Sequence, residues 1–187
     1  PCVGKGDYVK AGHVISQAAG FVSANVHSPV SGQVTAVDSV PDAGGIRRIA
    51  VTIRREGDEW ADGIDCGDTL IKECYLTDEE IIARITAAGI VGMGGATFPT
   101  QVKLSVPPGK RAEYLIVNGA ECEPYLTADY RTMLERGAEV LVGIDILCRA
   151  LGVTKAFIGI ENNKPGAVSH LTALAIGYPH IEIVALR

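Results

Sequence analysis

The sequence predicts a small all-β domain followed by an α/β domain. Short apolar runs punctuated by glycine fill residues 1–75, and this spacing is typical of a small β-barrel or sandwich. From residue 76 onward the apolar period becomes helical, and three strand-type runs alternate with helical segments up to residue 187. This alternation predicts a partial Rossmann-like fold, in which a mostly parallel sheet carries helices on both faces.

Length and composition describe an ordinary globular protein. The 187 residues are 47% hydrophobic and 21% charged, and a net charge of −5 offers no basic surface to nucleic acid. No apolar run reaches the roughly 20 residues that cross a bilayer, so we expect a soluble chain. The chain has five cysteines and no CxxC pair: Cys2, Cys66, Cys74, Cys122 and Cys148. We therefore expect reduced thiols, and no zinc or iron–sulfur site within these residues.

Candidate strands of the β domain follow one another at short spacing. They lie at residues 7–9, 14–15, 22–30, 34–37 and 46–53, with glycine turns between them. The stretch that follows, up to residue 76, is polar and glycine-punctuated, which predicts a connector. Trp60 lies in this connector, and we expect it to pack at the domain junction rather than to bind a ligand.

Capping signals delimit the helices of the α/β domain. Thr77 and Glu80 form a capping-box pattern, and Gly89 ends the helix that they begin. Further on, Thr127 is expected to cap a helix, and Asn162 or Asn163 to cap another with Pro165 in its first turn. The predicted strands are 114–117, 156–160 and 181–186, and the predicted helices between them include 127–134 and 138–151, the latter stopped by Gly152.

Two glycine-containing motifs hold polar residues that packing does not require. The first motif, residues 89–103, reads GIVGMGGATFPTQVK, and the second motif, residues 118–131, reads NGAECEPYLTADYR. Closely spaced glycines in the first expose backbone N–H groups, and Lys103 could meet a phosphate as a point charge. The spacing matches neither GxGxxG nor GxxxxGK[ST], so a plain glycine-rich turn stays open. The second motif follows a predicted strand, at the carboxyl end where α/β sheets bind ligands.

Taken together, the two motifs carry a family resemblance. The pattern GxGGAxFPTxxK followed by NGAECEP resembles the flavin- and NADH-binding subunit of respiratory complex I. The longer strings GATFPTQVKL and IVNGAECEPYLTADYR are still more similar to the C subunit (RnfC/RsxC) of the Rnf (Rsx) electron transport complex. The resemblance covers most of the chain, and it implies that residues 76–187 are the first part of a flavin-binding α/β domain in a longer protein.

This resemblance implies a role for each motif residue. Lys103 would lie near the flavin phosphate, Asn118 and Glu121 would hydrogen-bond the flavin, and Glu123 would form a neighbouring polar wall. The glycines would supply backbone contacts, and Phe98 would lie near the nicotinamide nucleotide. The predicted cofactor-binding residues are therefore Gly92, Gly94, Gly95, Phe98, Lys103, Asn118, Glu121 and Glu123.

Two positions depart from the family pattern. Met93 stands where the family has an arginine, and Ala120 where it has an aspartate. These changes could alter dinucleotide affinity, or keep flavin binding while weakening nucleotide binding. Cys122 lies between two glutamates, which predicts a raised thiol pKa, and we interpret it as a small buried residue rather than a nucleophile. No catalytic side chain and no metal ligand is predicted.

The β domain has a resemblance of its own. GDYVKAGHVI followed by SPVSGQV resembles the barrel-sandwich fold of lipoyl and biotinyl carrier domains. Those domains attach their cofactor to a lysine at a hairpin tip, where this chain reads GFVSANVH at residues 20–27. We therefore expect no covalent cofactor here, and a structural or docking role for the domain.

The resemblance implies an FMN-binding, NAD(H)-linked electron-transfer subunit. It would serve a membrane-associated, ion-translocating complex that passes electrons between NADH and ferredoxin, on the cytoplasmic side of the inner membrane. Two [4Fe–4S] clusters are expected outside these residues, and the piece alone is expected not to oxidise NADH. Its partners would be the other subunits of the complex.

Two alternatives remain from the sequence. The same fold could act as a non-catalytic scaffold that holds neighbouring subunits, or the chain could belong to the related cobalamin reductase of diol-utilising microcompartments. The continuation EPYLTADYR, residues 123–131, favours the Rnf protein by resemblance alone. The ion, the direction of electron flow and the oligomeric state are left open.

Overall fold

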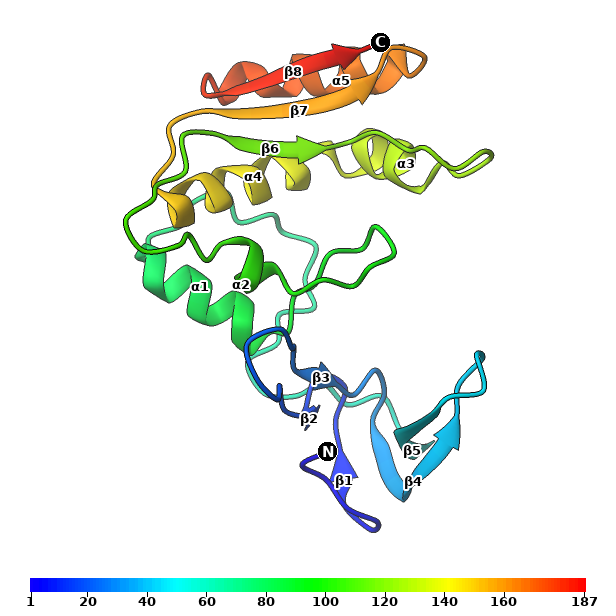
Figure 1. Cartoon of the computed structure of the whole chain (residues 1–187). Helices are drawn as coiled ribbons and strands as arrows, with labels where there is room; N and C mark the ends of the chain where they lie inside the picture. Colours follow the sequence, from blue (N-terminus) through cyan, green and yellow to red (C-terminus); the bar gives the residue numbers. More distant parts are fainter. The chain divides into compact units, whose positions relative to one another are not determined.

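A computed structural model describes residues 1–187 as two compact units. Unit 1 consists of Pro1–Asp68 and Ala83–Lys103, and unit 2 consists of Thr69–Ile82 and Leu104–Arg187 (Figure 1). Each unit is thus assembled from two separate stretches of sequence. The boundary between domains near residue 75 stays a prediction.

Unit 1 contains two small antiparallel sheets. β1 (Tyr8–Val9), β4 (Gly32–Pro41) and β5 (Arg47–Arg55) form a sheet in the order β1-β4-β5. The second sheet pairs β2 (Val14–Ser16) with β3 (Val26–His27). Short glycine-separated strands were predicted here, and the structure confirms them.

The β4–β5 hairpin is the longest pairing in unit 1. Its turn is held by Asp42, whose Oδ1 accepts backbone hydrogen bonds from Gly44 and Ile46, both at 2.9 Å. Asp42 thus closes the hairpin with an Asx-type turn. Beneath the sheets, Val9, Ile15 and Val34 form a small core.

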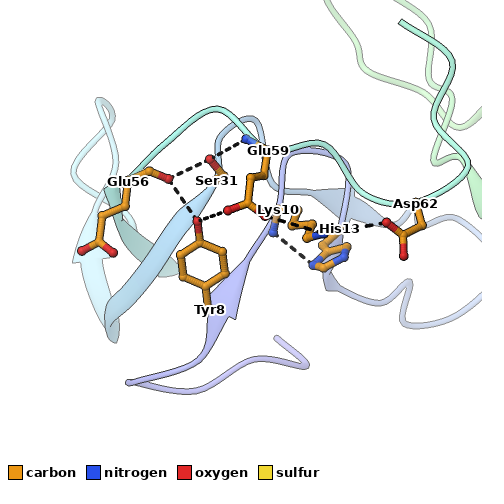
Figure 2. Close-up of polar contacts among 7 residues, drawn as sticks. All are labelled: Tyr8, Lys10, His13, Ser31, Glu56, Glu59 and Asp62. Carbon is orange, nitrogen blue, oxygen red and sulfur yellow. Dashed lines mark hydrogen bonds and ion pairs between the residues drawn. The ribbon is translucent and has the colours of Figure 1, made fainter.

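A polar cluster fixes the start of the connector against the β sheets of unit 1 (Figure 2). The buried Ser31 hydroxyl donates to the Glu56 carbonyl at 2.8 Å and accepts the Glu59 backbone N–H at 3.0 Å. The Tyr8 hydroxyl lies 3.2 Å from both the Glu56 carbonyl and the Glu59 carboxylate, and the Lys10 ammonium lies 3.6 Å from that carboxylate. The connector from residue 56 is therefore part of the folded unit.

Helix α1 (Asp78–Ala87) begins and ends at the predicted signals. The Thr77 N–H donates to the Glu80 carboxylate at 2.8 Å, and the Glu80 N–H donates to the Thr77 hydroxyl at 3.2 Å, which confirms the capping box. Gly89 follows the helix with φ +63°. A Cβ at this glycine would lie 2.3 Å from the Asn25 carbonyl oxygen, so both conformation and close approach require glycine.

Unit 2 is built on a parallel three-stranded sheet. β6 (Leu115–Asn118), β7 (Ala156–Glu161) and β8 (Ile181–Leu186) lie side by side in that order, with their arrows in the same direction (Figure 1). All three strands were predicted to within one residue at each end. The crossovers contain α3 (Ala128–Glu135), α4 (Gly137–Leu151), and α5 (Pro165–Leu174) with the short 3₁₀ turn Ala175–Gly177.

The helices of unit 2 pack on one face of this sheet. Leu141, Ile158, Ile160 and Leu171 are at most 1% exposed, and they form the core between strands and helices. Alternate residues of each strand point to the opposite face. There, Ile116 is 76% exposed and lies in an apolar groove of about 610 Å³.

The prediction of helices on both faces is therefore wrong for these residues. Two crossovers that step along a sheet in the same direction place their helices on the same face, and the order β6-β7-β8 allows no reversal. A parallel sheet is confirmed, whereas helices on its second face are not found within residues 1–187.

Of the helix-end signals predicted around α4 and α5 in unit 2, two are confirmed and one is wrong. Gly152 ends α4 in the left-handed conformation and Pro165 occupies the first turn of α5, as predicted. The residue at the N-cap of α5 is Lys164, without a side-chain cap hydrogen bond, so the prediction of Asn162 or Asn163 was wrong. None of the helices has the combination of length and hydropathy needed to cross a bilayer.

Candidate functional site

The first motif forms a closed loop in unit 1. Val91 and Pro99 make an isolated antiparallel bridge, and the Gly92 N–H donates to the Phe98 carbonyl at 2.8 Å. The loop between them leads into α2 (Thr100–Lys103), a single turn that ends on the predicted lysine. The backbone thus brings Lys103 back towards the glycine where the loop began.

Lys103 and Gly92 lie in close contact. A Cβ at Gly92 would lie only 2.6 Å from the Lys103 Nζ, so the absence of a side chain makes room for the ammonium group. No carboxylate lies within 4 Å of this ammonium group, in contrast to the lysines that form ion pairs elsewhere. Around Gly94 and Gly95 no atom would come within 4 Å of an added Cβ. An unpartnered cation in a loop with two open glycines fits an anionic group such as a phosphate.

Two side chains of this loop are exposed apolar groups. Phe98 is 39% exposed, and its backbone carbonyl rather than its ring makes the contact that closes the loop. Met93, at the position of the family's arginine, is 90% exposed. Both side chains are therefore accessible, and Met93 supplies no charge.

The second motif begins where β6 ends, in unit 2. The Asn118 side-chain oxygen accepts the Ala120 N–H at 3.1 Å, and the Gly119 N–H donates to the Gly159 carbonyl at 2.8 Å. These bonds turn the chain at the carboxyl end of the strand, as predicted from the fold. The amide nitrogen of Asn118 donates no hydrogen bond within the protein and remains available as a donor.

Glu121 makes internal contacts with both carboxylate oxygens. Its side chain is 6% exposed, and it accepts the backbone N–H groups of Asp129 at 2.8 Å and Tyr130 at 3.2 Å. Its Oε2 also lies 3.5 Å from the Lys164 ammonium. Glu121 therefore caps α3 from a distance, while Thr127 occupies the N-cap position without a side-chain hydrogen bond. The prediction of Thr127 as the capping group was wrong.

These contacts set the pKa of Glu121. Burial of the carboxyl group acts to raise its pKa, but the hydrogen bonds from Asp129 and Tyr130 and the nearby Lys164 prevail, so the pKa lies below its ordinary value. The carboxylate is consequently ionised in the folded protein at neutral pH.

Two residues beyond both motifs contact Glu121. The Glu161 Oε1 accepts the Glu121 N–H at 2.8 Å, and Lys164 faces the Glu121 carboxylate while its ammonium lies 5.1 Å above the Tyr130 ring. Neither residue was among the predicted site residues. The available signal was their position at the end of β7, which parallels the position of the second motif at the end of β6.

The neighbouring Cys122 and Glu123 are both exposed. The Cys122 thiol lies 3.3 Å from the Glu123 carboxylate, and this hydrogen bond is the main reason why the thiol pKa is raised. The raised pKa confirms that prediction, whereas the expectation of a buried Cys122 was wrong. No group of three or more His, Cys, Asp or Glu side chains is arranged to hold a metal ion.

The predicted residues thus form two groups, one in each unit. In unit 1 the fold brings Lys103 to Gly92 and leaves the other glycines open. In unit 2 it joins Glu121 to Glu161 and Lys164 and presents the Asn118 amide at the end of β6. Flavin and nucleotide contacts of these residues stay predictions.

Comparison with family models divides the chain in a consistent way. Residues 1–58 match the model described as the RnfC barrel sandwich hybrid domain. Residues 85–187 match the model described as the Nuo51 FMN-binding domain. The predicted order of a barrel-sandwich domain and a flavin-subunit-like domain with a parallel sheet is confirmed at this level.

Curated relatives align with the whole chain or nearly so. The C subunit of the proton-translocating ferredoxin:NAD(+) oxidoreductase complex of Clostridium ljungdahlii is 49% identical over 187 residues, which cover 100% of this chain and 40% of the relative. The C subunit of the Na(+)-translocating ferredoxin:NAD(+) oxidoreductase complex of Acetobacterium woodii is 42% identical, covering 100% of this chain and 42% of the relative. The chain thus spans less than half of these relatives.

Among solved structures, the NAD+-reducing [NiFe]-hydrogenase in its air-oxidised state shares 24% identity and a TM-score of 0.47 with this chain. The match covers 58% of this chain and 20% of the hydrogenase chain. This similarity is too distant to support a conclusion about function.

Proposed function

The chain belongs to the RnfC family, the C subunits of ion-translocating oxidoreductase complexes, and from this membership we propose that it binds FMN in an NAD-linked electron-transfer protein. The proposal is supported by the match of residues 85–187 to an FMN-binding domain model. It is also supported by the names of relatives that are ferredoxin:NAD(+) oxidoreductase subunits.

The observation that carries the proposal is the contact between Lys103 and Gly92. The FMN phosphate is a dianion at neutral pH, and it needs a cation and backbone N–H donors. The first motif offers a lysine without an internal acidic partner, in a loop where an added Cβ at Gly94 or Gly95 would meet nothing within 4 Å. We expect Lys103 to pair with the phosphate, and Gly92, Gly94 and Gly95 to let the cofactor approach the backbone.

The second motif would hold the flavin ring system. Asn118 has free amide donors for a ring carbonyl, and Glu123 is exposed and can form a polar wall. Glu121 would contact the flavin while it caps α3, since a carboxylate has about four acceptor positions. Bound flavin would accept two electrons from the nicotinamide and release them one at a time.

The remaining parts of the proposal concern the complete complex. Phe98 would lie near the nicotinamide nucleotide, so that NAD(H) is the second cofactor. Electrons would pass between NADH and ferredoxin through two [4Fe–4S] clusters outside residues 1–187. The protein would act peripherally on the cytoplasmic side of the inner membrane, together with the other subunits of an ion-translocating complex.

Equilibrium binding of FMN to the natural full-length protein tests this proposal. We expect Lys103→Ala to weaken FMN affinity by about tenfold to a hundredfold, because a charge-assisted contact with the phosphate is lost. Lys5→Ala is the matched control, since Lys5 is an exposed lysine of the same unit without an ion pair. It should leave the affinity unchanged.

Riboflavin, which lacks the phosphate, sharpens the test. Its affinity should be weak and equal in the wild type and in Lys103→Ala. A wild-type protein that binds no FMN, or a Lys103→Ala variant with unchanged FMN affinity, would contradict the site and favour a scaffold role.

A further inference from the structure

The backbone N–H and the side-chain carboxylate of Glu121 both contact the segment that leads from β7 into α5. The end of β7, where the turn to α5 begins, supplies Glu161, which accepts the Glu121 backbone N–H at 2.8 Å. Three residues later the turn supplies Lys164, whose ammonium lies 3.5 Å from the Glu121 carboxylate. One turn therefore fixes both the backbone and the side chain of a residue in the second motif.

Lys164 is the only cation among these close contacts. Its side chain is 18% exposed, its ammonium also lies over the Tyr130 ring, and no other residue forms an ion pair with Glu121. The second oxygen of Glu161 is buried and has no hydrogen-bond partner among the protein atoms. Such orphan acceptors are rare and weaken a fold, so this arrangement is not explained by stability alone.

We propose that the β7–α5 turn positions the second motif for its ligand, with Glu161 holding the backbone of Glu121 and Lys164 holding its carboxylate. This inference rests on the proposed function, because the ligand is the flavin. Lys164 also offsets the negative charges of Glu121 and Glu161, which would lie beside the flavin ring system. Charge near a flavin shifts its midpoint potential, since negative charge disfavours the reduced, anionic form.

The test measures FMN affinity, midpoint potential and melting temperature in the natural full-length protein. Lys164→Met keeps the length of the side chain and removes its charge, and we expect about tenfold weaker FMN binding and a lower midpoint potential. Lys164→Arg should restore both. Glu161→Gln removes a negative charge and keeps an acceptor for the Glu121 N–H, so the potential should rise.

Lys155→Met provides a matched control. Lys155 also pairs with a glutamate, Glu182 at 3.0 Å, and lies 4.7 Å above an aromatic ring, that of Phe157. It belongs, however, to the amino end of β7, away from the second motif. Its loss should leave FMN affinity and potential unchanged. It should lower the melting temperature less than Lys164→Met does, because Glu182 is exposed whereas Glu121 is almost covered.

The outcomes separate the two proposals. Suppose that wild-type protein binds FMN and Lys103→Ala weakens binding, but Lys164→Met, like Lys155→Met, leaves FMN affinity and midpoint potential unchanged. The positioning role is then overturned and the proposed function stands. Potentials that shift in the same direction in Lys164→Met and Glu161→Gln would also overturn it. If the wild type binds no FMN, the proposed function fails and the positioning role fails with it. If Lys164→Met does not fold, Lys164→Arg and Glu161→Gln decide.

Discussion

The two motifs differ in how their charged groups are used. In the first motif, Lys103 has no acidic partner and lies against a glycine. In the second motif, Glu121 is 6% exposed and is surrounded by donors from three other residues. The comparison teaches that a charged residue in a candidate binding motif is informative about ligands only once its internal partners are known.

Solvation explains the difference. An exposed lysine keeps its hydration and needs no partner, so it is free to exchange water for a phosphate. A carboxylate that is almost covered must have donors, because burial of an unpaired charge costs far more than a hydrogen bond returns. Glu121 therefore has a structural task whatever else it binds, and Lys103 has none.

The largest effect on stability is expected at the start of the first motif. Gly89→Ala should lower the free energy of unfolding by about 2–3 kcal/mol, because alanine is strained at positive φ and its Cβ would collide with the Asn25 carbonyl. Gly94→Ala is the control within the same motif, where an added Cβ meets nothing within 4 Å. Chemical denaturation measures both. Equal losses in the two variants would show that the open part of the loop is itself a folding requirement.

A smaller but pH-dependent effect is expected at Glu121. Since its pKa is lowered in the folded state, its contribution to stability is present above the ordinary value of 4.5 and is lost as the pH falls through the folded-state pKa. Glu121→Gln should therefore lower the melting temperature at pH 7 by about 2–4 °C and flatten its decline below about pH 5.

Melting curves of both proteins between about pH 3 and pH 7 check this expectation. Lys103→Ala is the counterpart from the first motif, and its stability should match the wild type within about 0.5 kcal/mol at every pH. The contrast between the motifs would be lost if Lys103→Ala were as destabilising as Glu121→Gln.

The smallest effect is expected at Thr127. Its side chain makes no cap hydrogen bond, so Thr127→Ala should change stability by less than about 0.5 kcal/mol. Loss of a working N-cap costs about 1 kcal/mol. Thermal melting at neutral pH distinguishes the two values, and a loss of the larger size would mean that Glu121 shares the capping task with Thr127.

Much of the candidate site was predictable, and what was missed has one cause. Lys103 lies where the sequence spacing suggested, because only a closed loop and one helical turn separate it from Gly92. Asn118 follows a strand whose apolar residues were evident, so its place at the sheet's carboxyl end was predictable too. The end of the second strand, residues 161–164, could face the site or cap a helix by sequence alone, and the contacts of Glu161 and Lys164 with Glu121 were not predictable across 40 and 43 residues.

By itself the sequence determined the local elements, namely the Thr77–Glu80 capping box, the stop at Gly89, the β4–β5 hairpin and the individual strand segments β6, β7 and β8. Each depends on residues close together in the chain, whose side-chain period and hydrogen-bonding groups are visible without any fold. The tertiary structure alone decided which groups cap α3, which face of the sheet is covered and which charges have partners. Those outcomes depend on where distant strands end beside one another, since a buried carboxylate is stabilised by whichever donors the folded chain brings to it.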